Sequence, residues 1–152
     1  MAIAHSPSRD ASSARLVLAF IAGVLAVPIF HQVLLWILHA AGVVPFAPFN
    51  MAPTRPLGVP ELVSLSFWGG VWGIIFALTL PRWFSGTAYS IAAMLVGGVA
   101  LTLVFMFVVW PLKFGGLPTD IPGLFVIGFL LNAAWGLGWA LLMRWFEQMR
   151  HT

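Results

Sequence analysis

Four long apolar stretches alternate along the chain with shorter stretches that hold the prolines and most of the charged residues. The apolar stretches cover about residues 16–41, 61–80, 88–110 and 122–143. Each has roughly the 20 residues that an α-helix needs to cross the hydrocarbon core of a bilayer. Their residues do not alternate between apolar and polar as those of a half-buried β-strand would, so the pattern predicts four transmembrane helices.

Proline and capping residues set the expected ends of these helices. Five prolines lie between residues 43 and 60, and because proline lacks an amide donor and has a fixed φ, this segment is expected to form a loop. Pro60 suits the first position of the second helix. We expect Pro111 to end the third helix and Thr119 or Asp120 to cap the fourth.

Polar residues flank the predicted membrane domain, which covers residues 15–146. Residues 1–14 are small and polar, which predicts a flexible N-terminal tail, and residues 147–152 form a short C-terminal tail. The first apolar run has 26 residues, whereas the apolar part of a secretory signal peptide has about 7 to 15. We therefore expect this run to be retained as a membrane anchor.

Composition supports the membrane class and excludes several others. Hydrophobic residues make up 61% of the chain and charged residues 7%, whereas a soluble domain has about 25% charged residues. The seven Lys and Arg residues are scattered, so they form no basic patch and no nucleic-acid partner is expected. Because the chain has no Cys, disulfides and thiolate metal sites are excluded. The expected fold is an all-α integral membrane bundle whose main partner is the lipid bilayer.

The distribution of Lys and Arg predicts the orientation. Arg55 and Lys113 lie in the first and third loops, whereas five residues lie in or next to the two tails or in the second loop: Arg9, Arg15, Arg82, Arg144 and Arg150. Positive residues collect on the cytoplasmic side of a membrane. The pattern predicts a multi-pass protein of the bacterial inner membrane with both termini in the cytoplasm.

The second half of the chain resembles the first. Residues 60–84 match residues 122–146 without a gap, with seven identities in 25 positions. A composition rich in Leu, Phe and Trp produces some such matches by accident, but both segments begin with proline and end with Arg-Trp-Phe. We interpret the match as a tandem duplication of a helical hairpin, with the two copies parallel.

Small residues recur at every fourth position in the second and fourth helices, a spacing that lets helix backbones approach closely in lipid. They are Gly69, Gly73, Ala77, Gly128, Gly136 and Ala140. Trp72 and Trp135 lie deep within the same helices, although tryptophan usually collects at membrane interfaces. Two interpretations are open: the indoles fill the space beside glycines, or they form a wall around an apolar ligand such as a quinone or a pigment.

Four polar side chains lie within predicted spans and are candidates for buried polar function: His31, Gln32, His39 and Asn132. Polar groups are costly in the membrane, so each needs a reason. One reason is packing, in which His31 or Gln32 bonds Asn132 across the bundle. The other is a proton or ion path, although no Asp or Glu lies at mid-membrane. No cofactor or metal is expected, because two histidines on one helix cannot bind opposite faces of one haem.

Four charged residues are expected at the outer end of the bundle: Arg55, Glu61, Lys113 and Asp120. Glu61 and Asp120 lie at helix N-termini, where the helix dipole favours anions. The group forms either helix caps or a periplasmic mouth or docking surface. The sequence contains no catalytic signature, so we do not expect an enzyme.

Two functions fit these features. The first is a structural or accessory subunit that self-associates as a homo-oligomer or docks on a larger membrane complex. The alternative is a small oligomeric permease or channel with a polar path through His31, Gln32 and Asn132.

The predicted orientation can be tested with reporter fusions. A reporter that works only in the cytoplasm is expected to be active when fused after Thr152 and inactive when fused within the proline-rich loop, because positive residues flank the former site. Activity at Thr152 of a reporter that works only in the periplasm would overturn the orientation.

Overall fold

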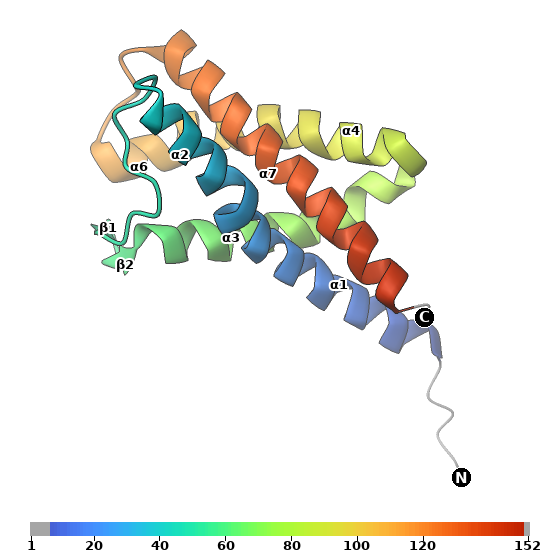
Figure 1. Ribbon diagram of the computed structural model, residues 1–152. Coiled ribbons are helices and arrows are strands. Elements are labelled where there is room, and N and C mark those ends of the chain that lie inside the picture. Colours follow the sequence, from blue (N-terminus) through green and yellow to red (C-terminus); the bar gives the residue numbers. More distant parts are fainter. Residues whose placement is uncertain (1–6, 151–152) are drawn as a thin grey trace.

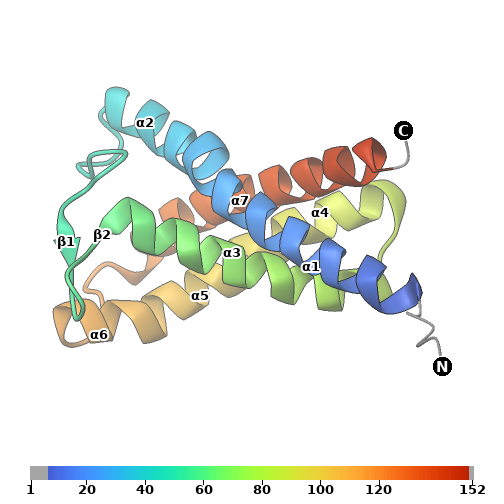
Figure 2. The same ribbon diagram turned by 90° about the horizontal axis from the view of Figure 1, so that it is seen from below.

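The computed structural model describes the backbone of residues 7–150 and the side chains from residue 12 onward. Four helical segments in it are long and apolar enough to cross a membrane, as the sequence predicted. They run side by side, with the start of α1 and the end of α7 at one end of the bundle (Figures 1 and 2). These segments are Ser12–Ala40, Glu61–Arg82, Gly86–Phe114 and Ile121–Met149.

Short π-helical turns interrupt two of the four segments. The first consists of α1 (Pro7–Ala26), the π-turn η1 (Val27–His31) and α2 (Gln32–Ala40). The second consists of α3 (Glu61–Thr79) and the 3₁₀ turn η2 (Leu80–Arg82). The third consists of α4 (Gly86–Val96), η3 (Gly97–Leu101), α5 (Thr102–Val104), η4 (Phe105–Val109) and α6 (Trp110–Phe114). The fourth is the single helix α7 (Ile121–Met149).

The first and last helices are longer than the sequence predicted. Helix α1 begins at Pro7, within the segment expected to be a flexible tail, and α7 continues to Met149. Residues 1–6 of that tail lie outside the described part of the chain. A hydropathy pattern marks only the apolar part of a helix. The helix itself can extend further where a contact with another element stabilises its end. Here Arg15 and Glu147 form an ion pair at 3.0 Å between the two helices.

Pro111 does not end the third segment, contrary to the prediction. It lies in the first turn of α6, directly after the π-turn η4, and the helix continues to Phe114. Pro28, inside the first segment, lies likewise at the start of the π-turn η1. In a π-turn each amide bonds to the carbonyl one residue further back than in an α-helix. We attribute the continuation of the helix through both prolines to these turns.

The loop before α3 contains a short antiparallel hairpin, β1 (Pro53–Thr54) and β2 (Val59–Pro60), in which Pro53 pairs with Pro60. Pro60 is therefore the N-cap of α3, with extended backbone, and not its first helical residue as predicted. At the start of α7 a carboxylate oxygen of Asp120 accepts a hydrogen bond of 3.0 Å from the Gly123 amide. Asp120 thus caps α7.

Helices α1 and α3 touch backbone to backbone. A Cβ atom placed on Gly23 would lie 2.1 Å from the Gly69 carbonyl oxygen, and one placed on Gly73 would lie 2.3 Å from the Ala19 carbonyl oxygen. No side chain fits at such distances. Only glycine permits this approach.

Helices α4 and α7 make the same kind of contact in the second half of the chain. A Cβ atom on Gly136 would lie 2.2 Å from the Ala93 carbonyl oxygen, and one on Gly97, in η3, would lie 3.0 Å from the Asn132 carbonyl oxygen. Gly128 lies against the side chain of Thr102 in α5. Helix α7 also contacts α1 and η1, so it joins the two halves of the bundle (Figure 2).

Adding one methyl group in this contact is expected to separate α1 from α3. Gly23→Ala should lower the free energy of unfolding in detergent by about 1–3 kcal/mol, the usual cost of overpacking. The control is Val17→Leu, which adds one carbon on an exposed position of the same helix and should leave stability unchanged. Equal thermal unfolding midpoints for both variants would contradict the close contact.

Candidate functional site

Two buried junctions at the centre of the bundle each join three helices. The Trp135 indole in α7 donates to the Gly23 carbonyl in α1 at 3.0 Å, beside Gly69 of α3. The Trp139 indole donates to the Ala19 carbonyl at 3.1 Å, beside Gly73. The glycines of α3 leave room for the indole nitrogens at the carbonyls of α1.

The aromatic rings at these junctions are covered by protein. Trp135 is 1% exposed and Trp139 is fully buried, and both rings contact Phe76 edge to face at 5.5 Å between centroids. Trp72 is half-buried and contacts Phe76 at 6.3 Å. Trp135 and Trp139 therefore pack beside glycines of α3 and leave no surface free for an apolar ligand. Alongside them, Ala77 and Ala140 are also buried in the core.

Gln32 holds the proline-rich loop. Its side chain is 3% exposed, and its Oε1 accepts a hydrogen bond of 2.7 Å from the Phe49 amide. Phe49 has a φ of 52°, a left-handed conformation that is unusual for a residue with a bulky side chain. The buried acceptor stabilises this conformation of the loop.

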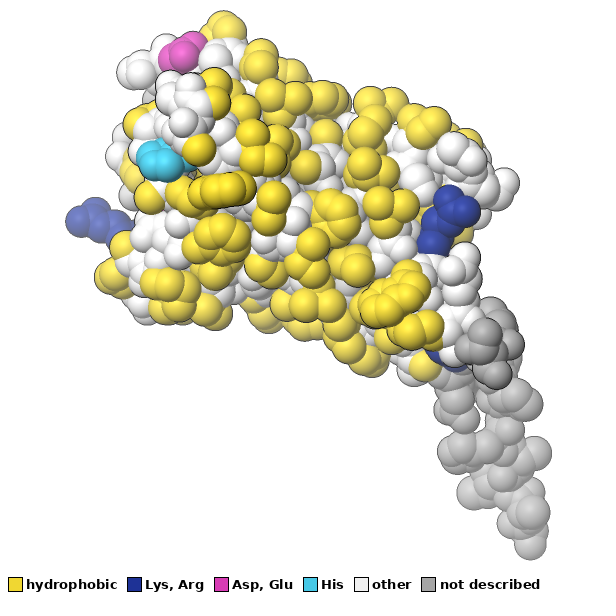
Figure 3. Space-filling view, viewed as in Figure 1, with side chains coloured by type: hydrophobic (Ala, Val, Ile, Leu, Met, Phe, Trp, Pro, Cys, Tyr) yellow, Lys and Arg dark blue, Asp and Glu magenta, His cyan; other side chains and the backbone are white. Residues whose placement is uncertain are grey.

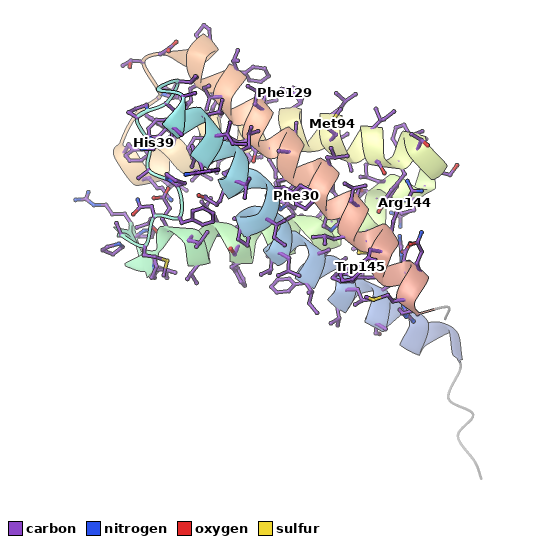
Figure 4. The ribbon with its side chains drawn as sticks, viewed as in Figure 1. Phe30, His39, Met94, Phe129, Arg144 and Trp145 are labelled. Atoms are coloured by element: carbon purple, nitrogen blue, oxygen red, sulfur yellow. The ribbon has the colours of Figure 1, made fainter. Side chains whose placement is uncertain are left out.

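His39 holds the same loop from the end of α2. Its Nδ1 lies 3.1 Å from the Val44 carbonyl oxygen, and because a carbonyl only accepts, Nδ1 carries the proton that is donated. Beneath this contact Leu35, Val44 and Leu131 form a small apolar cluster. Figure 4 shows His39 near the C-terminal end of α2, beside the loop.

Asn132 pairs with a residue that the sequence analysis missed. Its Nδ2 donates to the hydroxyl of Thr102 at 2.9 Å, and Thr102 is fully buried. This bond joins α7 to α5. The interpretation in which Asn132 bonds to His31 or Gln32 is therefore wrong. Thr102 is one of few polar residues in the third span, but threonine has too little polarity to stand out from hydropathy.

His31 is the one polar candidate whose side chain lacks a partner in the described part of the chain. It lies at the end of the π-turn η1, and its Nδ1 is buried without a hydrogen bond. The structure thus disperses the predicted polar residues. Gln32 and His39 bind the loop and Asn132 binds Thr102, whereas His31 bonds neither to the loop nor to Thr102.

A hollow of about 480 Å³ lies at the loop end of the bundle, and three of the four predicted outer charges line it: Arg55, Glu61 and Lys113. The carboxylate of Glu61 accepts a hydrogen bond of 2.6 Å from Asn50. Asp120 caps α7 and does not line the hollow. Two cations beside one bonded carboxylate can attract an anionic group, but this set contains no nucleophile with an adjacent base.

The side chains of residues 12–150 include no group of three His, Asp or Glu that could hold a metal ion. Comparisons of the chain with family models, curated proteins and solved structures found no match.

Replacing the buried acceptor is expected to loosen the loop. Gln32→Leu removes Oε1 with little change in volume, so the Phe49 amide loses its partner, at a cost of about 1 kcal/mol. We expect faster amide exchange at Phe49 and faster proteolysis of the loop. The control is Gln148→Leu, at an exposed position near the end of α7, and loop protection equal to wild type in the Gln32 variant would contradict the tether.

Proposed function

We propose that this chain is a multi-pass protein of the bacterial inner membrane, with both termini in the cytoplasm, that acts as a structural or accessory subunit. One observation carries the proposal. The polar side chains of the spans are used to hold helix against helix or helix against loop, as Gln32, Asn132 and the two buried tryptophans do. This use suits a rigid scaffold better than a conduit.

The surface supports a membrane location. Large apolar side chains that are more than half exposed occur on all four helical segments, among them Trp36, Phe67, Val108 and Val126. An exposed apolar surface of this extent requires a cover, which lipid would provide. In the face shown in Figure 3, apolar side chains cover the middle and the charged side chains lie towards the ends.

The backbone contacts support a duplicated hairpin. Each half of the chain has two such contacts: Gly23 with Gly69 and Gly73 with Ala19 in the first half, and Gly97 with Asn132 and Gly136 with Ala93 in the second. Corresponding residues differ by 74 in number on the first helix of each hairpin and by 63 on the second. The offset of 63 differs by one residue from the sequence match at 62. It also aligns Trp72 with Trp135 and Ala77 with Ala140. We infer two parallel hairpins of common origin.

The alternative function, an oligomeric permease or channel, needs a polar path through His31, Gln32 and Asn132. Two of these residues bond to groups outside this set: Gln32 to the Phe49 amide and Asn132 to the Thr102 hydroxyl. This arrangement favours the accessory subunit, which in our proposal docks on a larger membrane complex or on copies of itself.

The two functions predict different results for one double variant. His31→Ala with Asn132→Ala should leave an accessory subunit in a complex of unchanged composition and size, because neither side chain is needed on the lipid-facing surface. A tagged copy would be purified from its native host in mild detergent, and the stoichiometry of its complex measured by size-exclusion chromatography and mass spectrometry.

Two controls accompany this measurement. The destabilised variant Gly23→Ala should lose the complex in proportion to the loss of folded protein, and Val17→Leu should retain it. A wild-type protein that purifies only with itself, and whose double variant assembles but loses ion or solute flux in vesicles, would establish the permease instead.

A further inference from the structure

A second hollow, of about 280 Å³, lies at the end of the bundle where α1 starts and α7 ends, and all four helical segments contribute to it. Arg15 comes from α1, Pro81 from η2, Tyr89 from α4 and Arg144 from α7. Hydropathy did not indicate this site, because the residues that line it lie at or near the ends of the apolar stretches. The fold brings them together.

The charges of this hollow favour an anion. Arg15 is held in place, since its Nε bonds Glu147 at 3.0 Å and its Nη1 donates to the Ala77 carbonyl at 3.1 Å. Arg144 also lines the hollow, is exposed, and makes no hydrogen bond or ion pair within residues 12–150. Two arginines against one paired carboxylate leave an excess of positive charge. Figure 4 shows Arg144 on the part of α7 near the end of the bundle.

Uncharged donors line the same hollow. The Tyr89 side chain lines the hollow, and its hydroxyl oxygen is buried without a hydrogen-bond partner in the described part of the chain. Helix α4 starts here, and its N-cap residue Ser85 makes no side-chain capping bond. The Tyr89 amide donates to the Ser85 carbonyl, and the amides of Gly86, Thr87 and Ala88 are left for an anion.

Exposed aromatic residues surround this end of the bundle. Trp83 and Phe84, which follow η2, and Trp145, which follows Arg144, are all exposed. Tryptophan at a helix end is typical of the interface between lipid headgroups and acyl chains. On the proposed orientation, this interface is the cytoplasmic one.

We propose that the hollow binds a phosphate group. Guanidinium groups, a phenol hydroxyl and the amides of a helix N-terminus are together the donors that phosphate oxygens accept from most strongly. The phosphate is carried by an anionic phospholipid or is free in solution. The lipid source rests on the membrane location proposed above, whereas binding of free phosphate does not.

The test uses the full chain, purified in neutral detergent, with thermal unfolding and native mass spectrometry as readouts. Phosphatidylglycerol, phosphatidylcholine and inorganic phosphate are titrated separately. We expect phosphatidylglycerol to raise the unfolding midpoint and to remain bound in the mass spectrum, and phosphatidylcholine, whose headgroup carries a compensating cation, to do neither. A response to inorganic phosphate alone would support the site and identify free phosphate as the ligand.

Variants identify the hollow as the place of binding. Arg144→Gln should weaken the apparent affinity about tenfold, because one charge-assisted contact is lost. Tyr89→Phe should weaken it by roughly threefold to tenfold. The matched control is Arg82→Gln, since Arg82 lies at the same end but donates to the Leu78 carbonyl and does not line the hollow. This control should bind within about twofold of wild type.

Two results would overturn the proposal. One is equal loss of binding in Arg144→Gln and Arg82→Gln, which would show attraction by net charge alone. The other is the absence of any response that distinguishes phosphatidylglycerol or phosphate from phosphatidylcholine. The stoichiometry of the native complex is measured on separate preparations, so failure of the phosphate site and failure of the accessory function are distinguishable.

Discussion

The backbone contact between α1 and α3 is the constraint on which the rest of the bundle depends. The Ala19 and Gly23 carbonyls of α1 face glycines of α3, and the Trp139 and Trp135 indoles of α7 donate to the same two carbonyls. In the membrane location that we propose, apolar attraction between helices would contribute little, so close packing and hydrogen bonds would hold the helices together. A single added Cβ would move α3 and displace an indole at the same time, which would also loosen α7.

This tight centre leaves the recognition chemistry to the two ends. At one end Gln32 and His39 hold the loop that forms one wall of a charged hollow. At the other end the ion pair of Arg15 and Glu147 holds α1 and α7 around a hollow with unused donors. A rigid, apolar middle with polar ends suits a subunit that is positioned by lipid and by partner proteins, which is the function we propose.

The positions of the four helical segments followed from the sequence because hydropathy and the spacing of small residues are local properties. The stripe of Gly69, Gly73 and Ala77 could be read for the same reason, and Gly69 and Gly73 lie in a close contact. The prediction failed where a neighbour intervenes. The helix continues through Pro111 because a π-turn precedes it. Helices α1 and α7 extend beyond their apolar residues, and Arg15 and Glu147 form an ion pair between them.

The candidate polar residues also separate what the sequence determines from what the tertiary structure determines. The sequence by itself determined that Gln32 and Asn132 must find partners, because an unpaired polar group is costly in an apolar medium. Only the tertiary structure decided that these partners are the Phe49 amide and the Thr102 hydroxyl, and that Arg144 and Tyr89 share one hollow. Hydropathy depends on one segment at a time, whereas a hydrogen bond or a binding site depends on which segments meet, and that is set by the glycine contacts between the helices.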